Sequence, residues 1–310
     1  MGSKEAWNKP VKTKVSVIVL SKNNGETLEN CLRSIINSGG DKEIIVVDAH
    51  SKDKTVQILK KYKKKVRVLY DEGKGIGVAR NVGVRASSGE IICFVDADAY
   101  ISRDHLIKIT KYFDEHPDVG VAHVQGALRT SKEPTYIEKL AYIFQIRGRM
   151  GIPPYAGGYF LSFRRKVFCD VGGFWDFPPY GADDLDFTLR AMDKGWKKGW
   201  IKTEGWHQSR RTISGLWREM WGWGKGKSCF DRKYSSHPYV MSLNRRRKLY
   251  KILGKWYWLG IELIRLMAPI IALKYLPKWK SLGVYFYYII KEWAHVLGYI
   301  WGSLTWARNL

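Results

Sequence analysis

The stretch Glu90-Ile-Ile-Cys-Phe-Val-Asp-Ala-Asp98 decides the fold. Its apolar residues run without interruption up to Asp96, which is typical of a strand that is buried on both faces of a sheet. Other short apolar runs precede it, and segments with helical spacing lie between them. The strands predicted in this way are 15–20, 43–47 and 66–70, and the helices are 27–36, 51–62 and 77–86. This alternation predicts an α/β fold with a mostly parallel central sheet.

The acidic residues at the ends of these strands are the first candidates for a site. Ligands of such sheets bind beyond the carboxyl ends of the strands, and the sequence places Asp48, Asp96 and Asp98 there. Two carboxylates one residue apart can converge on a divalent cation that bridges the phosphate oxygens of a nucleotide. The alternative is a turn in which aspartate only caps the next helix.

Two later segments add groups that could take part in catalysis. Gly181-Ala-Asp-Asp-Leu-Asp-Phe187 gathers three carboxylates at the start of a helix predicted over 184–194, where the dipole favours anions and a base can face a cleft. The same residues could simply form an acidic first turn. His207 follows an extended segment and could complete a metal site or meet a phosphate, although a lone histidine is more often structural.

The glycine-rich segment Gly73-Lys-Gly-Ile-Gly-Val-Ala-Arg-Asn81 precedes the helix over 77–86. It lacks the G-x-G-x-x-G spacing of a dinucleotide-binding loop. Lys74 and Arg80 at a helix start nevertheless suit a phosphate or a base edge. A nucleotide is therefore expected here as a substrate.

Composition excludes several classes of protein. The chain has 310 residues, a formal charge of +24 and 45% hydrophobic residues, which excludes a disordered chain, a collagen and a small disulfide scaffold. Its four cysteines show no C-x-x-C spacing, so neither a zinc knuckle nor a redox pair is predicted, and reduced thiols in the cytosol are expected. No signal-peptide pattern is found at the start, so secretion is not expected.

The positive charge gathers toward the end of the chain. Residues 201–310 carry 20 Lys and Arg but only 5 Asp and Glu, and tryptophan is concentrated there as well. This combination is typical of a membrane headgroup zone or of a single-stranded nucleic-acid groove. The stretches 256–276 and 282–304 are each about as long as a membrane span but contain charged residues, so helices lying in the membrane interface are favoured over spanning helices or helices packed on the core.

Taken in order, these motifs resemble glycosyltransferase family 2, whose members are inverting enzymes with the GT-A fold. The resemblance covers about residues 13–210 and implies a Rossmann-like three-layer α/β/α sandwich. It implies a tail at 1–12, a catalytic domain at 13–240 with a nucleotide-binding half (13–100) and an acceptor half (101–240), and a membrane-associating helical region at 241–310. The segments that carry the resemblance are 15–24, 46–55, 77–83, 94–98 and 181–187.

The resemblance also implies roles for individual residues. Asp48 would contact the base or ribose of the nucleotide, and Arg80 would lie near the donor. Asp98, assisted by Asp96, would bind Mn²⁺ or Mg²⁺ at the diphosphate. The remaining assignments are Asp184 as general base with Asp183 beside it, His207 near the metal, and Gly157 and Gly158 at the sugar pocket.

Departures from the family pattern limit what can be predicted of the substrates. Ala49 and His50 occupy places where the family usually has Asp-Gly, so UDP-sugars and GDP-sugars both remain possible donors. The Gln-x-x-Arg-Trp pattern of processive synthases is missing, which predicts a single transfer per encounter. We expect a metal-dependent transferase at the cytoplasmic face of the cell membrane, acting on a lipid-linked or membrane-proximal acceptor.

Two other functions fit parts of the sequence. A nucleotidyltransferase that forms nucleotide sugars would have a similar sheet, but it would need a more glycine-rich loop than Ser21–Gly25. A non-enzymatic nucleic-acid binder would use the cations and aromatic residues of 217–227, but it would leave the acidic clusters unexplained. Nucleic acid is therefore not an expected partner, and the oligomeric state is not predicted.

Overall fold

The computed structural model describes residues 14–129, 133–147, 156, 159–175, 181–242 and 282–306, together with 260, 263, 267, 269 and 270. The chain divides into two compact units, which are described separately below. The first comprises Met1–Ala127, Tyr155–Asp176 and Asp183–Gln208, and the second comprises Leu128–Pro154, Phe177–Ala182 and Ser209–Leu310.

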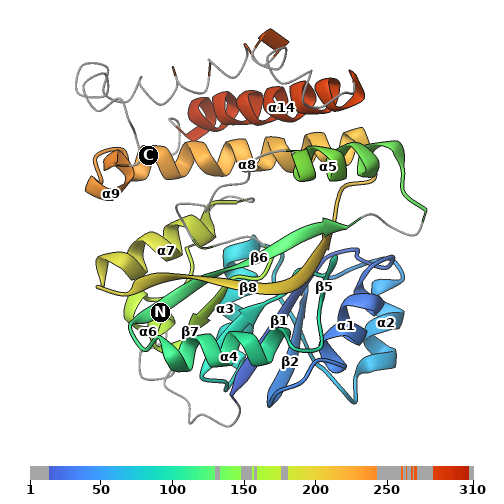
Figure 1. The fold of residues 1–310 in the computed structure, drawn as a ribbon, viewed down its shortest axis with the longest axis vertical. Helices are drawn as coiled ribbons and strands as arrows, with labels where there is room; N and C mark the ends of the chain where they lie inside the picture. Colours follow the sequence, from blue (N-terminus) through green and yellow to red (C-terminus); the bar gives the residue numbers. More distant parts are fainter. Residues whose placement is uncertain are drawn as a thin grey trace. The chain divides into compact units, whose positions relative to one another are not determined.

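The first unit is built on one sheet with the strand order β3-β2-β1-β4-β7-β6-β8-β5 (Figure 1). The strands β1, β2, β3 and β4 run parallel to one another. From β7 onward the paired strands are antiparallel, as in β4–β7, β6–β7 and β5–β8. The strands are β1 (Val15–Ser21), β2 (Lys42–Asp48), β3 (Arg67–Tyr70), β4 (Ile91–Phe94), β5 (Ala99–Ile101), β6 (Val119–Arg129), β7 (Ser162–Arg164) and β8 (Lys197–Gln208).

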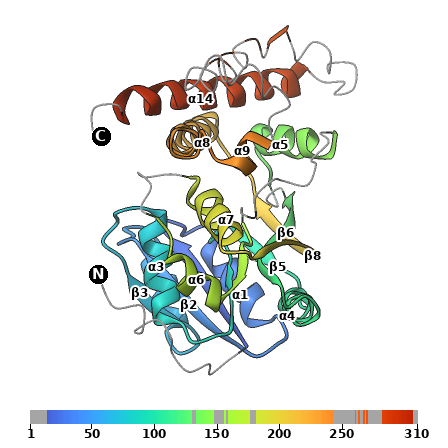
Figure 2. The same cartoon turned by 90° about the vertical axis from the view of Figure 1, so that its left-hand side faces the viewer.

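Helices cover both faces of this sheet (Figure 2). Val17 and Val19 of β1 face one buried cluster, whereas Ile18 between them faces the other. The first cluster is covered by α1 (Leu28–Ile36), α2 (Thr55–Tyr62) and α4 (His105–Glu115), and the second by α3 (Ile76–Ala86), α6 (Arg165–Val171) and α7 (Asp183–Asp193). Burial on both faces explains why the parallel strands are continuous apolar runs.

Helix α3 lies unusually close to the sheet because of one glycine. A Cβ atom at Gly83 would lie 2.6 Å from Cγ2 of Ile18, so any larger residue would push the helix away. The helix begins after Gly75, whose φ of 131° favours glycine. This close packing fixes the position of Arg80, about one turn from the helix start.

The predicted three-layer α/β/α architecture is confirmed. The strands and helices predicted before residue 100 are present, with ends that shift by a few residues, and the helix predicted at 51–62 begins at Thr55. The extended segment expected before His207 is the long strand β8, which covers Lys197–Gln208. The sheet is parallel in its first half, as predicted, and mixed as a whole, because the strands after β4 form antiparallel pairs.

The second unit is helical and contains α5 (Tyr136–Arg147), α8 (Ile213–Lys233), α9 (Pro238–Ser242) and α14 (Leu282–Trp306). Its core joins Leu140 of α5, Met220 of α8 and Val284 of α14. Glycines bring α8 and α14 into backbone contact, since a Cβ at Gly224 would lie 1.9 Å from the carbonyl oxygen of His295. The two helices are neighbours in both views, and Figure 2 shows α14 lengthwise beside α8, which is seen nearly end-on (Figures 1 and 2).

The domain limits expected at residue 240 do not coincide with this division, because α8 groups with α14; the functional domains remain a prediction. The stretch 256–276 lies outside the described residues apart from five single positions. Among the described helices, none is both long enough and apolar enough to cross a membrane.

Candidate active site

The turn after β4 is held rigidly at the carboxyl end of the parallel strands. The backbone N–H of Asp96 donates to the carbonyl oxygen of Tyr159 at 3.3 Å, and the N–H of Ala99 donates to the carbonyl oxygen of Asp96 at 2.8 Å. Beneath it, Cys31 is buried, and burial together with the nearby carboxylates of Asp98 and Asp96 raises the pKa of its thiol well above the usual range. That thiol is therefore inert.

Three side chains converge at this turn. Ala99 of β5 pairs with His207 of β8, which brings Nε2 of His207 to 3.0 Å from Oδ1 of Asp98. The imidazole stacks on the ring of Tyr159 with a centroid distance of 3.6 Å. Asp96, Asp98 and His207 each offer one ligand atom, and these atoms all lie within 4.8 Å of one another.

This cluster fits a divalent metal ion. Two carboxylate oxygens and one imidazole nitrogen suit Mn²⁺ and are compatible with Mg²⁺, for which water and phosphate oxygens would complete the coordination. The three residues are the ones that the sequence analysis named as metal ligands.

A buried ion pair lies next to this cluster. Arg80 of α3 pairs with Asp183, the first residue of α7, and both side chains are less than 10% exposed. The guanidinium also lies 5.1 Å from the ring centroid of Phe94 and 5.3 Å from that of Phe174. The negative charges of Asp183, Asp184 and Asp96 raise the pKa of Arg80 in spite of its burial. Arg80 therefore links the two acidic clusters electrostatically.

The three carboxylates of α7 differ in their surroundings. Burial raises the pKa of Asp183 to about 6, although Arg80 opposes this shift. Asp186 is fully buried and pairs with Arg190 at 2.6 Å, so it has a structural role. Asp184 is half-buried, and its Oδ1 accepts a hydrogen bond from the backbone N–H of Leu185 at 2.9 Å. Asp184 is thus the carboxylate of this group that a substrate can reach.

Asp48 is buried and organises the loop that follows β2. Its Oδ2 accepts a hydrogen bond from the backbone N–H of Ser51 at 2.9 Å, and its Oδ1 accepts one from the Ser51 hydroxyl at 2.6 Å. The same hydroxyl accepts from the N–H of Asn23 at 2.7 Å, which ties the loop after β1 to the loop after β2. A contact between Asp48 and a nucleotide stays a prediction.

No described contact joins the other predicted donor-binding residues to the cluster of Asp96, Asp98 and His207. Lys74 is exposed and forms an ion pair with Glu72. Gly157 and Gly158 lie outside the described residues. Tyr159 belongs to the segment that the family resemblance assigned to the sugar pocket, but its stacking on His207 was not predicted from the sequence. Sequence reasoning also missed Asp71, which directly follows a predicted strand just as Asp48 and Asp96 do.

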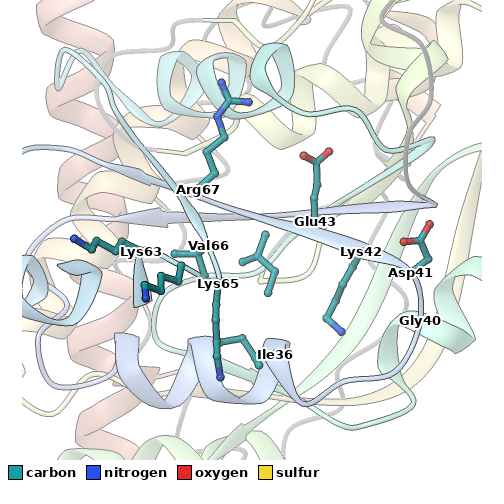
Figure 3. Close-up of a pocket in the computed structure, with 11 residues that line it drawn as sticks. Ile36, Gly40, Asp41, Lys42, Glu43, Lys63, Lys65, Val66 and Arg67 are labelled. Atoms are coloured by element: carbon teal, nitrogen blue, oxygen red, sulfur yellow. The ribbon is translucent and has the colours of Figure 1, made fainter. Parts of the chain in front are cut away.

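A hollow in the first unit lies away from this site. It has a volume of about 810 Å³ and is lined by Lys42 and Glu43 of β2, Lys65, Arg67 of β3 and neighbouring residues (Figure 3). Lys42 and Arg67 are the first residues of their strands. This hollow is therefore at the amino ends of the strands, opposite to the edge that carries the acidic cluster.

Comparison with known proteins identifies the family. The profile described as Glycosyl transferase family 2 matches residues 16–172, about half of the chain. The chain belongs to glycosyltransferase family 2. The chain has the GT-A fold, as the sequence analysis predicted.

The relatives match different shares of this chain. Poly(ribitol-phosphate) beta-N-acetylglucosaminyltransferase TarS of Staphylococcus aureus is 36% identical over 121 residues, which are 36% of this chain and 21% of TarS. Poly-beta-1,6-N-acetyl-D-glucosamine synthase of Staphylococcus epidermidis is 24% identical over 234 residues, 68% of this chain and 54% of the relative. The chain thus spans about a fifth to about half of the length of these relatives.

Solved structures show the same fold. The mannosyltransferase PcManGT from Pyrobaculum calidifontis, in complex with GDP-Man and Mn²⁺, superposes with a TM-score of 0.60 at 20% identity and covers 97% of this chain and 92% of its own. TarS 1-349 of S. aureus in complex with UDP gives a TM-score of 0.50 at 20% identity, covering 96% of this chain and 92% of its own.

Proposed function

We propose that this glycosyltransferase is metal-dependent and inverting, and that it transfers a single sugar from a nucleoside-diphosphate sugar to a lipid-linked or membrane-proximal acceptor. The observation that carries the proposal is the convergence of Asp96, Asp98 and His207 at the carboxyl end of the sheet. The solved relatives support it, since PcManGT was solved with GDP-Man and Mn²⁺ and TarS with UDP.

In this proposal Asp96, Asp98 and His207 hold Mn²⁺ or Mg²⁺. When bound, the metal supplies positive charge to the diphosphate of the donor. Tyr159 keeps the imidazole in place by stacking at 3.6 Å. The charge of Asp96 helps to raise the pKa of Arg80. The positive charge of Arg80 in turn offsets the repulsion between the acidic groups and the donor.

Asp184 serves as the general base. Its carboxylate takes the proton of an acceptor hydroxyl while that oxygen forms a bond to the anomeric carbon. The bond from this carbon to the diphosphate oxygen breaks with its electron pair on the nucleoside diphosphate, so one displacement inverts the anomeric centre. With a phosphate acceptor, already ionised, Asp184 would orient the acceptor rather than deprotonate it.

The remaining predicted residues have supporting roles in this mechanism. Asp183, fixed by Arg80, holds the first turn of α7 and thereby the position of Asp184. Asp48 keeps the loop after β2 in the shape that meets the nucleoside. Lys74 would meet the phosphates after release from Glu72. Gly157 and Gly158 would shape the sugar pocket.

The exposed face of α14 supports a membrane-bound acceptor. Its exposed apolar side chains fall within a stripe about 100° wide at helical spacing, which is typical of a helix lying in the membrane interface. The net positive charge of the final third of the chain favours anionic lipid. The residues of the stripe are Leu282, Phe286, Trp293, Leu297, Trp301 and Leu304. We propose that the enzyme works at the cytoplasmic face of the cell membrane.

The catalytic part of the proposal is tested with Asp98→Asn and Asp184→Asn. Thermal melting is followed with UDP, GDP and their sugar conjugates, each with Mn²⁺, Mg²⁺ or EDTA. A donor at a hundredfold excess over its dissociation constant should stabilise the wild type by about 2.7 kcal/mol. Asp98→Asn should lose this metal-dependent shift, whereas Asp184→Asn should keep it and lose sugar transfer. Metal-dependent binding retained by Asp98→Asn would refute the metal assignment.

The membrane part is tested by flotation with phosphatidylglycerol vesicles. Phe286→Glu with Trp301→Glu places two carboxylates in the apolar stripe and should release the protein from the lipid. Ile107→Glu is the matched control, because Ile107 is a similarly exposed apolar residue on α4. Flotation of the double variant with the wild type would contradict the role of α14.

A further inference from the structure

Asp71 is a buried carboxylate whose oxygens make no described hydrogen bond. The residue directly follows β3 and is 4% exposed. Its Oδ1 is fully buried and accepts no hydrogen bond from any described group. A buried carboxylate oxygen without a donor is costly, so an external donor is a physical reason for keeping an aspartate here.

The position of Asp71 places it at the nucleoside end of the candidate site. Its backbone N–H donates to the carbonyl oxygen of Asp48 at 3.4 Å, so the two residues adjoin at the carboxyl ends of β3 and β2. In the sheet, β3 is separated from β4 by β2 and β1. With about 4.8 Å between neighbouring strands, Asp71 lies about 14 Å along the sheet from the turn after β4. An extended nucleoside diphosphate spans a comparable length between its phosphates and its base.

Asp48 itself is poorly suited to recognise the base, because both of its oxygens already accept hydrogen bonds from Ser51. Oδ1 of Asp71 accepts no hydrogen bond from a described group. Beside it, the rings of His50 and Tyr70 are stacked with centroids 5.5 Å apart. Both side chains are exposed, and they offer a flat aromatic surface on which a base can stack. His50 is also where the sequence departs from the family pattern.

The geometry points to guanine as the base of the donor, recognised by the Asp71 carboxylate. This inference rests on the proposed function and adds the identity of the base. An ionised carboxylate only accepts hydrogen bonds. Guanine offers two adjacent donors, N1–H and the exocyclic amino group, which match two carboxylate oxygens. Uracil offers a single N3–H between two carbonyl oxygens, and one of these would face the second carboxylate oxygen. Adenine and cytosine place a ring acceptor beside their amino group.

Calorimetric titration with GDP and with UDP, each with Mn²⁺, tests the inference on the wild-type full-length chain. GDP should bind at least tenfold more tightly than UDP. Asp71→Asn replaces an acceptor by an amide with one donor and one acceptor, which matches the uracil edge. We expect it to weaken GDP binding by about 10- to 100-fold and to leave UDP binding unchanged or tighter.

Glu72→Gln is the matched control, because it removes the same charge from the neighbouring residue, whose side chain is 72% exposed. It should keep the wild-type preference. A wild type that binds UDP more tightly than GDP in the presence of metal would overturn the base assignment and leave the glycosyltransferase site intact. Failure of both nucleotides to bind with Mn²⁺ or Mg²⁺ would overturn the donor site itself. If Asp71→Asn does not fold, the wild-type preference decides.

Discussion

Breaking the buried ion pair between Arg80 and Asp183 should strongly destabilise the first unit. Both side chains are less than 10% exposed, and the guanidinium is enclosed by Phe94 and Phe174. Arg80→Ala leaves a buried carboxylate without a cation, and Asp183→Ala leaves a buried guanidinium without its counter-ion. Either change alone removes about 3–5 kcal/mol from the free energy of unfolding.

Removing both charges together should cost much less than the sum of the single changes. In the double variant Arg80→Met with Asp183→Ala, no charge remains unpaired, and the methionine keeps part of the packing against Phe94 and Phe174. Replacing a buried ion pair by apolar side chains is often close to neutral. The two sites should therefore show a coupling energy of about 2 kcal/mol or more, at the upper end of the range for residues in contact.

The assay is equilibrium denaturation in urea at pH 7.5, completed as a cycle of wild type, Arg80→Met, Asp183→Ala and the double variant. The exposed pair Lys197–Asp118 gives a control cycle, which should show no measurable coupling because solvent screens it. Additive effects of the Arg80 and Asp183 substitutions would refute the reasoning, since a buried pair cannot be broken additively. Sugar transfer by the double variant should fall even where it folds, because Asp184 loses the support of its neighbour.

Two further predictions concern other parts of the chain. Burial lowers the pKa of His105 to about 4, below its value in the unfolded chain. Protonation therefore favours the unfolded chain, and the free energy of unfolding falls by about 3 kcal/mol as the pH falls from 6.5 toward 4. His105→Asn should flatten that part of the pH profile of urea midpoints, and an unchanged slope would contradict it. Gly224→Ala should lower the melting temperature, because its Cβ would lie 1.9 Å from the carbonyl oxygen of His295 and overpacking costs about 1–3 kcal/mol or more. An unaltered melting temperature would show that α8 and α14 are not in backbone contact.

The first half of the fold could be predicted from the sequence because its strands are buried on both faces. Continuous apolar runs such as 44–47 have no competing interpretation between two helical segments. The segments missed have weaker patterns: β7 is only three residues long and ends at Arg164, and β6 mixes polar with apolar residues. Their partners are set by the sheet as a whole, which local periodicity does not encode.

The candidate site likewise has features that could be predicted from the sequence and features that could not. The aspartates after β4 stand next to a strong strand signal, so their place at the carboxyl edge followed from the sequence. The partner of Arg80 did not, because Asp183 lies 103 positions further along the chain. Asp48 shows a second limit, since the position of the residue was predictable and its two hydrogen bonds to Ser51 were not.

The metal cluster depends on the register of β5 against β8. His207 reaches Asp98 because Ala99 pairs with His207 and the backbone N–H of Gln208 donates to the carbonyl oxygen of Asp98 at 2.9 Å. Side chains of a strand alternate between faces, so a shift by one residue would turn the imidazole away and bring Trp206 or Gln208 into its place. A lone histidine in a sequence is weak evidence of a ligand. It becomes a candidate ligand through the pairing of two strands that are distant in sequence, and this pairing is what the structure adds.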